Sequence, residues 1–364
     1  MKTNKIDFKK SISLFSGSLI IGALIFSSTG CAKKKSEVAP ETGTSTTSSA
    51  GARISGFTWT AQSATGNWNA ISFYDATHGL IVGMGGAISK TSNSGSSYFP
   101  ITTAATTNDL YACRYLTSSN MLIAGSNSTL KVSINQGSTW TNATLPSGIG
   151  SVDFRGFYFL STSIGFVVGG NNTILKTING GNSWTLSNTG IAGTGTLYSV
   201  YFFNSLKGCA TGNNGMLYKT IDGGSTWTSS SIFNDPRINL TSINFPTSQI
   251  GFITTAVDVP LPQDSINHVL KTVDGGATWT QHYLLIPSAS AYAVKFFSPT
   301  IGYIVGGNNA TNNGFISATI DGGINWTTQT IPASGTLLGL ALQNNVNTGA
   351  AYAVGKNNAV IKGQ

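Results

Sequence analysis

The chain has 364 residues, which is enough for one large domain or two of ordinary size. Charged residues make up only 9% of it, against roughly 25% in an average soluble protein, and glycine occurs 44 times, so long helices are not expected. The formal net charge is +8, but from residue 51 onward 13 Lys and Arg stand against 9 Asp, a mild +4 that excludes the footprint of a nucleic-acid-binding protein.

Residues 1–30 have the organisation of a secretory signal peptide. A basic start, MKTNKIDFKK, precedes the apolar run SLFSGSLIIGALIFSS, which is shorter than the roughly 20 residues of a membrane span. The segment STGC ends at Cys31 and resembles the bacterial lipobox, in which the cysteine carries the lipid. We therefore expect an extracytoplasmic protein anchored through Cys31 to a bacterial membrane, the outer membrane on its periplasmic or surface side. A plain transmembrane anchor is the alternative.

Residues 31–54 read as a flexible tether. The segment AKKKSEVAPETGTSTTSSAGA is rich in Ser, Thr and Ala and has no apolar period. Its three lysines, Lys33 to Lys35, would lie beside the bilayer, where each adds about 1 kcal/mol of attraction to anionic headgroups.

From residue 55 to the end, one ten-residue motif recurs. It reads KTINGGNSWT from Lys176, KTIDGGSTWT from Lys219, KTVDGGATWT from Lys271 and ATIDGGINWT from Ala318. Its central Asp or Asn recurs at spacings of 42, 44, 43, 52 and 47 residues, namely at Asn93, Asn135, Asn179, Asp222, Asp274 and Asp321. A fixed period of this length predicts a repeat architecture.

Each repeat carries the pattern of four short strands. Examples of the first two strands are AISFYDATHGLIVG and SVYFFNSLKGCATG; a third strand, the motif and a fourth strand that opens on Trp-Thr follow. Four strands in about 45 residues are typical of a β-propeller blade.

The blade count comes to seven. The six motifs give six blades, and the last segment, LLGLALQNNVNTGAAYAVGKNNAVIKGQ, supplies three strands of another. The stretch GFTWTAQ, from Gly56 to Gln62, has the second half of the motif and the start of a fourth strand. We therefore predict that this N-terminal strand completes the last blade and closes an all-β, seven-bladed propeller.

The motif itself is interpreted as structural. An Asp or Asn accepts hydrogen bonds from the amides of its own turn, the glycine two residues later supplies a positive φ, and the Trp packs between blades. Because three copies have Asn where the others have Asp, a hydrogen-bond acceptor fits this position better than a catalytic acid.

The motif resembles the Asp-box, or bacterial neuraminidase repeat, and the longer unit resembles the propellers of the photosystem II stability and assembly factors. The resemblance runs from Gly56 to Gln364. It implies a non-catalytic scaffold that holds protein partners during assembly of membrane complexes, partly through a patch of arginines. After Cys31 this chain has four arginines: Arg53, Arg114, Arg155 and Arg237.

Enzymatic activity is not expected. A sialidase needs a Tyr–Glu pair, and the only glutamates, Glu37 and Glu41, lie in the tether. A glycoside hydrolase with an Asp–Asp pair, or a glycan-binding adhesion module, remains the alternative. The histidines and cysteines lack metal-ligand spacing, so no metal or cofactor is expected. Cys113 and Cys209 are expected as buried free thiols, with a disulfide as the alternative.

The binding face is predicted opposite the Asp-box hairpins. Repeat-specific insertions often mark the binding face, and the long ones here are 256–268 and 307–314, both between the second and third strands of their blades. Just before the first strand, several blades carry a tyrosine or arginine that should surround the channel, although simple packing between blades is the alternative. The predicted partner-binding residues are Tyr111, Arg155, Tyr198, Arg237, Asp258, Asp264, His268 and Tyr292.

Overall fold

The computed structural model describes residues 58–103, 105–187, 194–233, 235–257, 267–284, 286, 288–308, 311–332, 335–343 and 349–364. For residues 267 and 268 it describes the backbone alone. The chain divides into two units, 1–45 and 46–364, and all described residues belong to the second. The predicted signal peptide, Cys31 and the tether lie outside the described residues.

The described residues form seven four-stranded antiparallel sheets, the blades. Blade 1 consists of β2 (Trp68–Phe73), β3 (Gly79–Gly83), β4 (Ile88–Thr91) and β5 (Phe99–Pro100), with the 3-10 turn η1 (Met84–Gly86) after β3. Blade 2 consists of β6 (Leu110–Tyr115), β7 (Met121–Gly125), β8 (Leu130–Ser133) and β9 (Thr141–Asn142). Blade 3 consists of β10 (Phe154–Phe159), β11 (Gly165–Gly169), β12 (Ile174–Thr177) and β13 (Thr185–Leu186).

The remaining blades repeat this order. Blade 4 consists of β14 (Leu197–Phe202), β15 (Gly208–Gly212), β16 (Met216–Thr220) and β17 (Thr228–Ser231). Blade 5 consists of β18 (Ile238–Asn244), β19 (Gly251–Val257), β20 (Asn267–Thr272) and β21 (Thr280–Leu284). Blade 6 consists of β22 (Ala289–Phe296), β23 (Gly302–Asn308), β24 (Gly314–Thr319) and β25 (Thr327–Thr328). Blade 7 consists of β26 (Leu337–Leu342), β27 (Ala351–Gly355), β28 (Val360–Gly363) and β1 (Trp59–Ala61).

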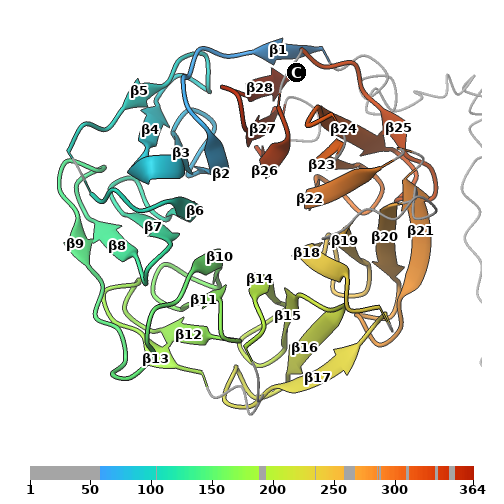
Figure 1. The fold of residues 1–364 in the computed structure, drawn as a ribbon, viewed down its shortest axis with the longest axis horizontal. Coiled ribbons are helices and arrows are strands. Elements are labelled where there is room, and N and C mark those ends of the chain that lie inside the picture. Colours follow the sequence, from blue (N-terminus) through green and yellow to red (C-terminus); the bar gives the residue numbers. More distant parts are fainter. Residues whose placement is uncertain are drawn as a thin grey trace, which may run out of the picture. The chain divides into compact units, whose positions relative to one another are not determined.

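The blades stand around a common axis, with the first strand of each innermost (Figure 1). We call these seven strands, β2, β6, β10, β14, β18, β22 and β26, the inner strands. The all-β, seven-bladed propeller predicted from the sequence is therefore confirmed.

Blade 7 joins the two ends of the described chain. Strand β1 pairs antiparallel with β28, with Trp59 opposite Gly363, at the place where the sequence predicts the missing fourth strand. The Trp59 side chain is buried and meets the Tyr303 ring edge to face at 5.8 Å. This pairing covers an edge of β28 that would otherwise be open to other chains.

The apolar cores lie between blades. In each hydrophobic cluster, residues of two neighbouring blades pack together, as Phe166 of blade 3 does with Phe202 and Trp227 of blade 4. The two phenylalanine rings stack at 3.9 Å, and Trp227 meets Phe202 edge to face at 5.9 Å. The Asp-box tryptophan thus packs where the sequence predicts, in the layer that joins one blade to the next.

Candidate functional site

Each inner strand contains a β-bulge near its start. The pairing register between the first and second strands skips one residue in all seven blades. A bulge leaves one residue out of the ladder and aims its side chain away from the regular pattern. The skipped residues, which we call the mouth ring, are Asn69, Tyr111, Arg155, Tyr198, Thr241, Tyr292 and Leu338.

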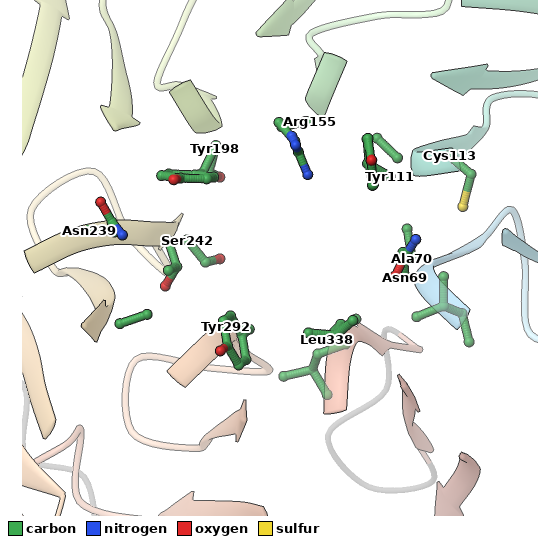
Figure 2. A pocket seen from close by; sticks show the side chains of 18 of the residues that line it. Asn69, Ala70, Tyr111, Cys113, Arg155, Tyr198, Asn239, Ser242, Tyr292 and Leu338 are labelled. Atoms are coloured by element: carbon green, nitrogen blue, oxygen red, sulfur yellow. The ribbon is translucent and has the colours of Figure 1, made fainter. Parts of the chain in front are cut away.

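All seven mouth-ring residues line one cavity of about 460 Å³ on the axis of the ring. Figure 2 shows labelled members of the ring, among them Tyr111, Arg155, Tyr198 and Tyr292, around this space. The bulge therefore turns seven equivalent positions of the repeat into the wall of a single site. Tyr and Arg at four of the seven positions are the residue types that dominate protein–protein contacts.

The residue after each bulge is small in every blade. The seven positions hold Ala70, Ala112, Gly156, Ser199, Ser242, Ala293 and Gly339. The inner strands converge at the axis, and a Cβ on Gly156 would lie 2.6 Å from the carbonyl oxygen of Tyr198 in the next blade. Crowding thus explains the small residues, while the mouth ring is free to vary.

Arg155 forms a fixed cluster with two neighbours. Its guanidinium lies 3.8 Å from the ring centre of Tyr111, and its Nη2 donates to Asp153 Oδ2 at 3.1 Å. Burial raises the pKa of Tyr111, and the Arg155 charge opposes this rise. The buried Nε of Arg155 has no hydrogen-bond partner in the described part of the chain.

The cavity lies on the face predicted for binding. The turn between the second and third strands donates to the carbonyl just before the inner strand, as in Ser126 N to Asp109 O and Gly170 N to Asp153 O, both near 3 Å. Residues Ala256 and Val257, where the long insertion of blade 5 begins, also line the cavity. The mouth ring and the start of this insertion therefore line the same cavity.

Of the other predicted site residues, the structure describes the side chain of Arg237 alone. Arg237 donates its Nε to Asp235 Oδ1 at 2.8 Å and its Nη2 to the other carboxylate oxygen, and it is absent from the described lining. This pair holds the pKa of Asp235 at about 2, mainly through the hydrogen bonds from Arg237. Asp258 and Asp264 lie outside the described residues, and so does the side chain of His268. Their binding roles stay predictions.

On the opposite face, the Asp-box residues bond within their own turns. In blade 4, Thr220 Oγ1 donates to Asp222 Oδ1 at 2.8 Å, and the amides of Gly224 and Thr226 donate to Thr220 and Asp222 at 2.9 Å. These hydrogen bonds, led by those from Thr226, hold the pKa of Asp222 at about 2. The carboxylate is thus occupied by its own hairpin.

The Asn and Asp copies of the turn differ only in the direction of one hydrogen bond. Thr226 Oγ1 donates to Asp222 Oδ2 at 2.6 Å, whereas Asn179 Nδ2 donates to Ser183 Oγ at 2.8 Å. A hydroxyl can donate or accept, so either residue completes the turn. This supports the prediction that the position needs an acceptor and not an acid.

A lysine recurs near the end of the third strand in several blades, and we call these residues the consensus lysines. They bind the Asp-box turn of the next blade. Lys90 donates to Gln136 O at 3.0 Å and Lys176 to Gly223 O at 2.9 Å, and Lys219 donates to Gly276 O. The contact between blades explains why lysine recurs at this position of the repeat.

A second ring of residues, which the spacing of the repeats did not indicate, lies three residues further along each inner strand. These positions hold Ser72, Arg114, Tyr158, Tyr201, Asn244, Lys295 and Ala341. Tyr158 and Tyr201 donate their hydroxyls to Phe202 O at 2.7 Å and Phe245 O at 3.1 Å in the following blades, and Lys295 lines the cavity. An alignment of the repeats at this offset would have revealed two cations among otherwise uncharged residues.

The remaining reactive groups form no further centre in the part of the chain that the structure describes. Cys113 and Cys209 are buried free thiols, as predicted, and burial raises the pKa of Cys209 to about 12. No three His, Cys, Asp or Glu side chains among the described residues could hold a metal ion. Nor does any helix there have the length and apolar character to cross a membrane.

The chain is similar to a known assembly factor in one stretch. The family described as photosynthesis system II assembly factor YCF48 matches residues 146–221, which span most of blades 3 and 4. No curated protein matches the chain. The chain is thus a repeat propeller that resembles the photosystem II assembly factor.

Solved structures share the fold at low sequence identity. YCF48 bound to a D1 peptide is 13% identical, with a TM-score of 0.63 over 84% of this chain and 96% of that one. YCF48 from Cyanidioschyzon merolae is 16% identical, with a TM-score of 0.61 over 84% and 98%. The GH74 xyloglucanase from Xanthomonas campestris is 13% identical, with a TM-score of 0.65 over 82% of this chain but 52% of the enzyme.

Proposed function

We propose that this protein is a non-catalytic scaffold that binds a protein partner at the mouth ring. The observation that carries the proposal is the set of seven bulges, which directs Tyr111, Arg155, Tyr198 and Tyr292 to one cavity on the axis. The blades are alike at their Asp-box turns and different here. A partner can therefore be recognised in one orientation, because the seven positions offer it five kinds of side chain in an order that breaks the sevenfold repeat.

The chemistry of the mouth favours a polypeptide. Tyrosine supplies a large contact area with few rotatable bonds, and tyrosine and arginine account for a large share of interface hot spots. Arg155 is held in place by Tyr111 and Asp153 before any partner arrives, so little side-chain entropy is lost on binding. Ala256 and Val257, where the insertion of blade 5 begins, line the same cavity.

A glycoside hydrolase or a glycan-binding module is the rival function. The likeness to the xyloglucanase propeller favours this rival function, but the matched part makes up only 52% of that enzyme. A hydrolase of this kind needs two carboxylates across the scissile bond. Among the described residues that line the cavity there is no Asp or Glu, which supports the scaffold proposal over the enzyme.

We also propose that the scaffold works outside the cytoplasm, tethered to a bacterial membrane by a lipid on Cys31. The basis is the sequence alone: a signal peptide, a lipobox-like STGC and a polar tether. Replacing Cys31 by Ser should release the protein or leave an unprocessed precursor. A Cys31→Ser protein that is processed and still firmly membrane-bound would contradict the lipid anchor.

The test is capture of partners from the native membrane by the full-length protein. The comparison variant has the insertion 256–268 shortened to the loop length of blade 4. Loop length changes stability only weakly, so this variant should fold normally and capture less partner. In parallel, purified protein should release no reducing sugar from xyloglucan. Equal capture by both proteins, or sugar release that depends on a cavity residue, would contradict the proposal.

A further inference from the structure

The channel holds more positive charge than the protein neutralises. Arg155 of the mouth ring pairs with Asp153. In the second ring, Lys295 lines the 460 Å³ cavity, and Arg114 occupies the equivalent position of another inner strand. Across the residues that the structure describes, neither Lys295 nor Arg114 takes part in a salt bridge.

The second-ring neighbours of these two cations cannot neutralise them. The hydroxyls of Tyr158 and Tyr201 donate to backbone carbonyls of the next blade, and Asn244 accepts from Phe296 N at 3.2 Å. These groups are uncharged, and the described lining of the cavity contains no carboxylate. The donors of one guanidinium and one ammonium are therefore left for water or a ligand.

The two cations also repel each other. Burial, and to a smaller extent the Arg114 charge, together lower the pKa of Lys295 to about 8. Arg114 is exposed to solvent, yet burial is the main cause that lowers its own pKa. Both facts fit side chains that meet water inside a channel rather than at the outer surface. Like charges that interact across one channel favour a bound counter-ion.

We propose that the channel binds a small oxyanion, a phosphate or carboxylate group, between Arg114 and Lys295. Arginine offers a planar fork of donors that matches such oxygens, and lysine adds a compact charge. The site is distinct from the consensus lysines, which donate to carbonyls of the adjacent blade. It goes beyond the scaffold role and does not depend on any protein partner.

The test measures thermal unfolding of the full-length protein with inorganic phosphate or acetate at pH 7. Sodium chloride at equal ionic strength is the reference, because it reproduces the screening without the oxyanion geometry. Binding to the folded state alone should raise Tm by about 3 °C at ten times Kd. A response to phosphate alone, to acetate alone or to both supports the site and identifies which source of oxyanion it accepts.

The variants Arg114→Met and Lys295→Met remove one charge each and keep a long side chain. Each should lose the phosphate and acetate response, and each should be at least as stable as the parent without anion because the repulsion is gone. Lys207→Met is the matched control, since Lys207 is exposed on the opposite face. It should respond like the parent. An anion response unchanged in both channel variants, or no response in the parent beyond that to chloride, would overturn the proposal.

A pH series supplies a second readout. Anion affinity should begin to fall as pH rises through about 8, where Lys295 starts to lose its proton in the free protein. The other charged or titratable groups that the structure describes around the channel are Arg114, Arg155 with Asp153, the Cys113 thiol, and the tyrosines at 111, 158, 198, 201 and 292. Lys295→Met should abolish the fall along with the binding. If the anion affinity of the parent stayed constant from pH 7 to 10, this would contradict a role of the Lys295 ammonium in binding the anion.

Discussion

The Asp-box turn and the mouth ring each occur once per blade, yet the two regions use repetition differently. In the six Asp-box turns the same residue types recur, and each turn satisfies its polar groups within itself, as Thr220 and Asp222 do. In the mouth ring the backbone bulge recurs, but the side chains differ from blade to blade. A recurring side chain therefore marks a folding requirement, and a recurring backbone with varying side chains marks a surface free to specialise.

Closure of the ring is the feature on which both regions depend, and its loss should have the largest effect. Deleting residues 51–64 removes β1, exposes the edge of β28 and takes the buried Trp59 from its contact with Tyr303. We expect a loss of several kcal/mol in the free energy of unfolding. Denaturant unfolding measures it, and a truncated protein as stable as the full chain would contradict the closing role of β1.

A bulky side chain in the Asp-box turn should have the next largest effect. Gly224 has φ +83°, and a Cβ there would lie 2.9 Å from Phe166 Cε1 and 3.0 Å from Ser187 Oγ. Gly224→Val should cost about 3 kcal/mol, through backbone strain and overpacking together. Gly148→Val is the control, because φ is +79° and no atom lies within 4 Å of the added Cβ. If both variants lost the same free energy of unfolding, backbone strain alone would explain the loss and overpacking would be excluded.

The second ring should make stability depend on pH in an unusual direction. The folded pKa of Lys295 is about 8, below its ordinary value of 10.5, so between these values the unfolded chain binds more protons. The Lys295 contribution to the free energy of unfolding therefore rises with pH from about 8 to 10.5. The free energies of unfolding of the parent and of Lys295→Met should differ most at the low end of this pH range and approach each other at the high end. Parallel curves would contradict the shift.

The smallest effect is expected for Asp222→Asn. Three sister turns contain Asn and are completed by reversing the hydrogen bond to a hydroxyl, as between Asn179 and Ser183. We expect a change in Tm of no more than about 2 °C, as for a typical surface substitution. A well-folded Asp222→Asn protein that no longer binds its partner would contradict the structural interpretation of the motif.

Much of the fold could be predicted because the blades share one sequence pattern. The turn residues, the Trp between blades and the closing strand follow from spacing and local chemistry. The tyrosines at 111, 198 and 292 and Arg155 could be found as exceptions at one position of the repeat. Their shared bulge could not, since a skipped pairing leaves no fixed residue type: Asn69, Thr241 and Leu338 occupy the same position.

The second ring was missed for a related reason. Arg114 and Lys295 lie in strand-like segments far apart in the sequence, and only the ring places their two inner strands, β6 and β22, around one axis (Figure 1). Arg237 was predicted as a binding residue from its place in a connection, and its guanidinium is bound to Asp235, so its binding role stays a prediction. Pairing between nearby side chains is decided by local geometry that spacing does not reveal.

The central claim is that the mouth ring binds the partner and that the Asp-box face serves only the fold. The most direct test compares two variants that each lose one positive charge. Arg155→Gln removes a cation at the mouth, and Lys207→Gln removes one from an exposed turn on the opposite face. Affinity for the captured partner should be measured for both by titration with folded, full-length protein. We expect a loss of about tenfold or more for Arg155→Gln and almost none for Lys207→Gln. An unchanged affinity for Arg155→Gln, with a loss for Lys207→Gln, would mean that the partner binds the other face.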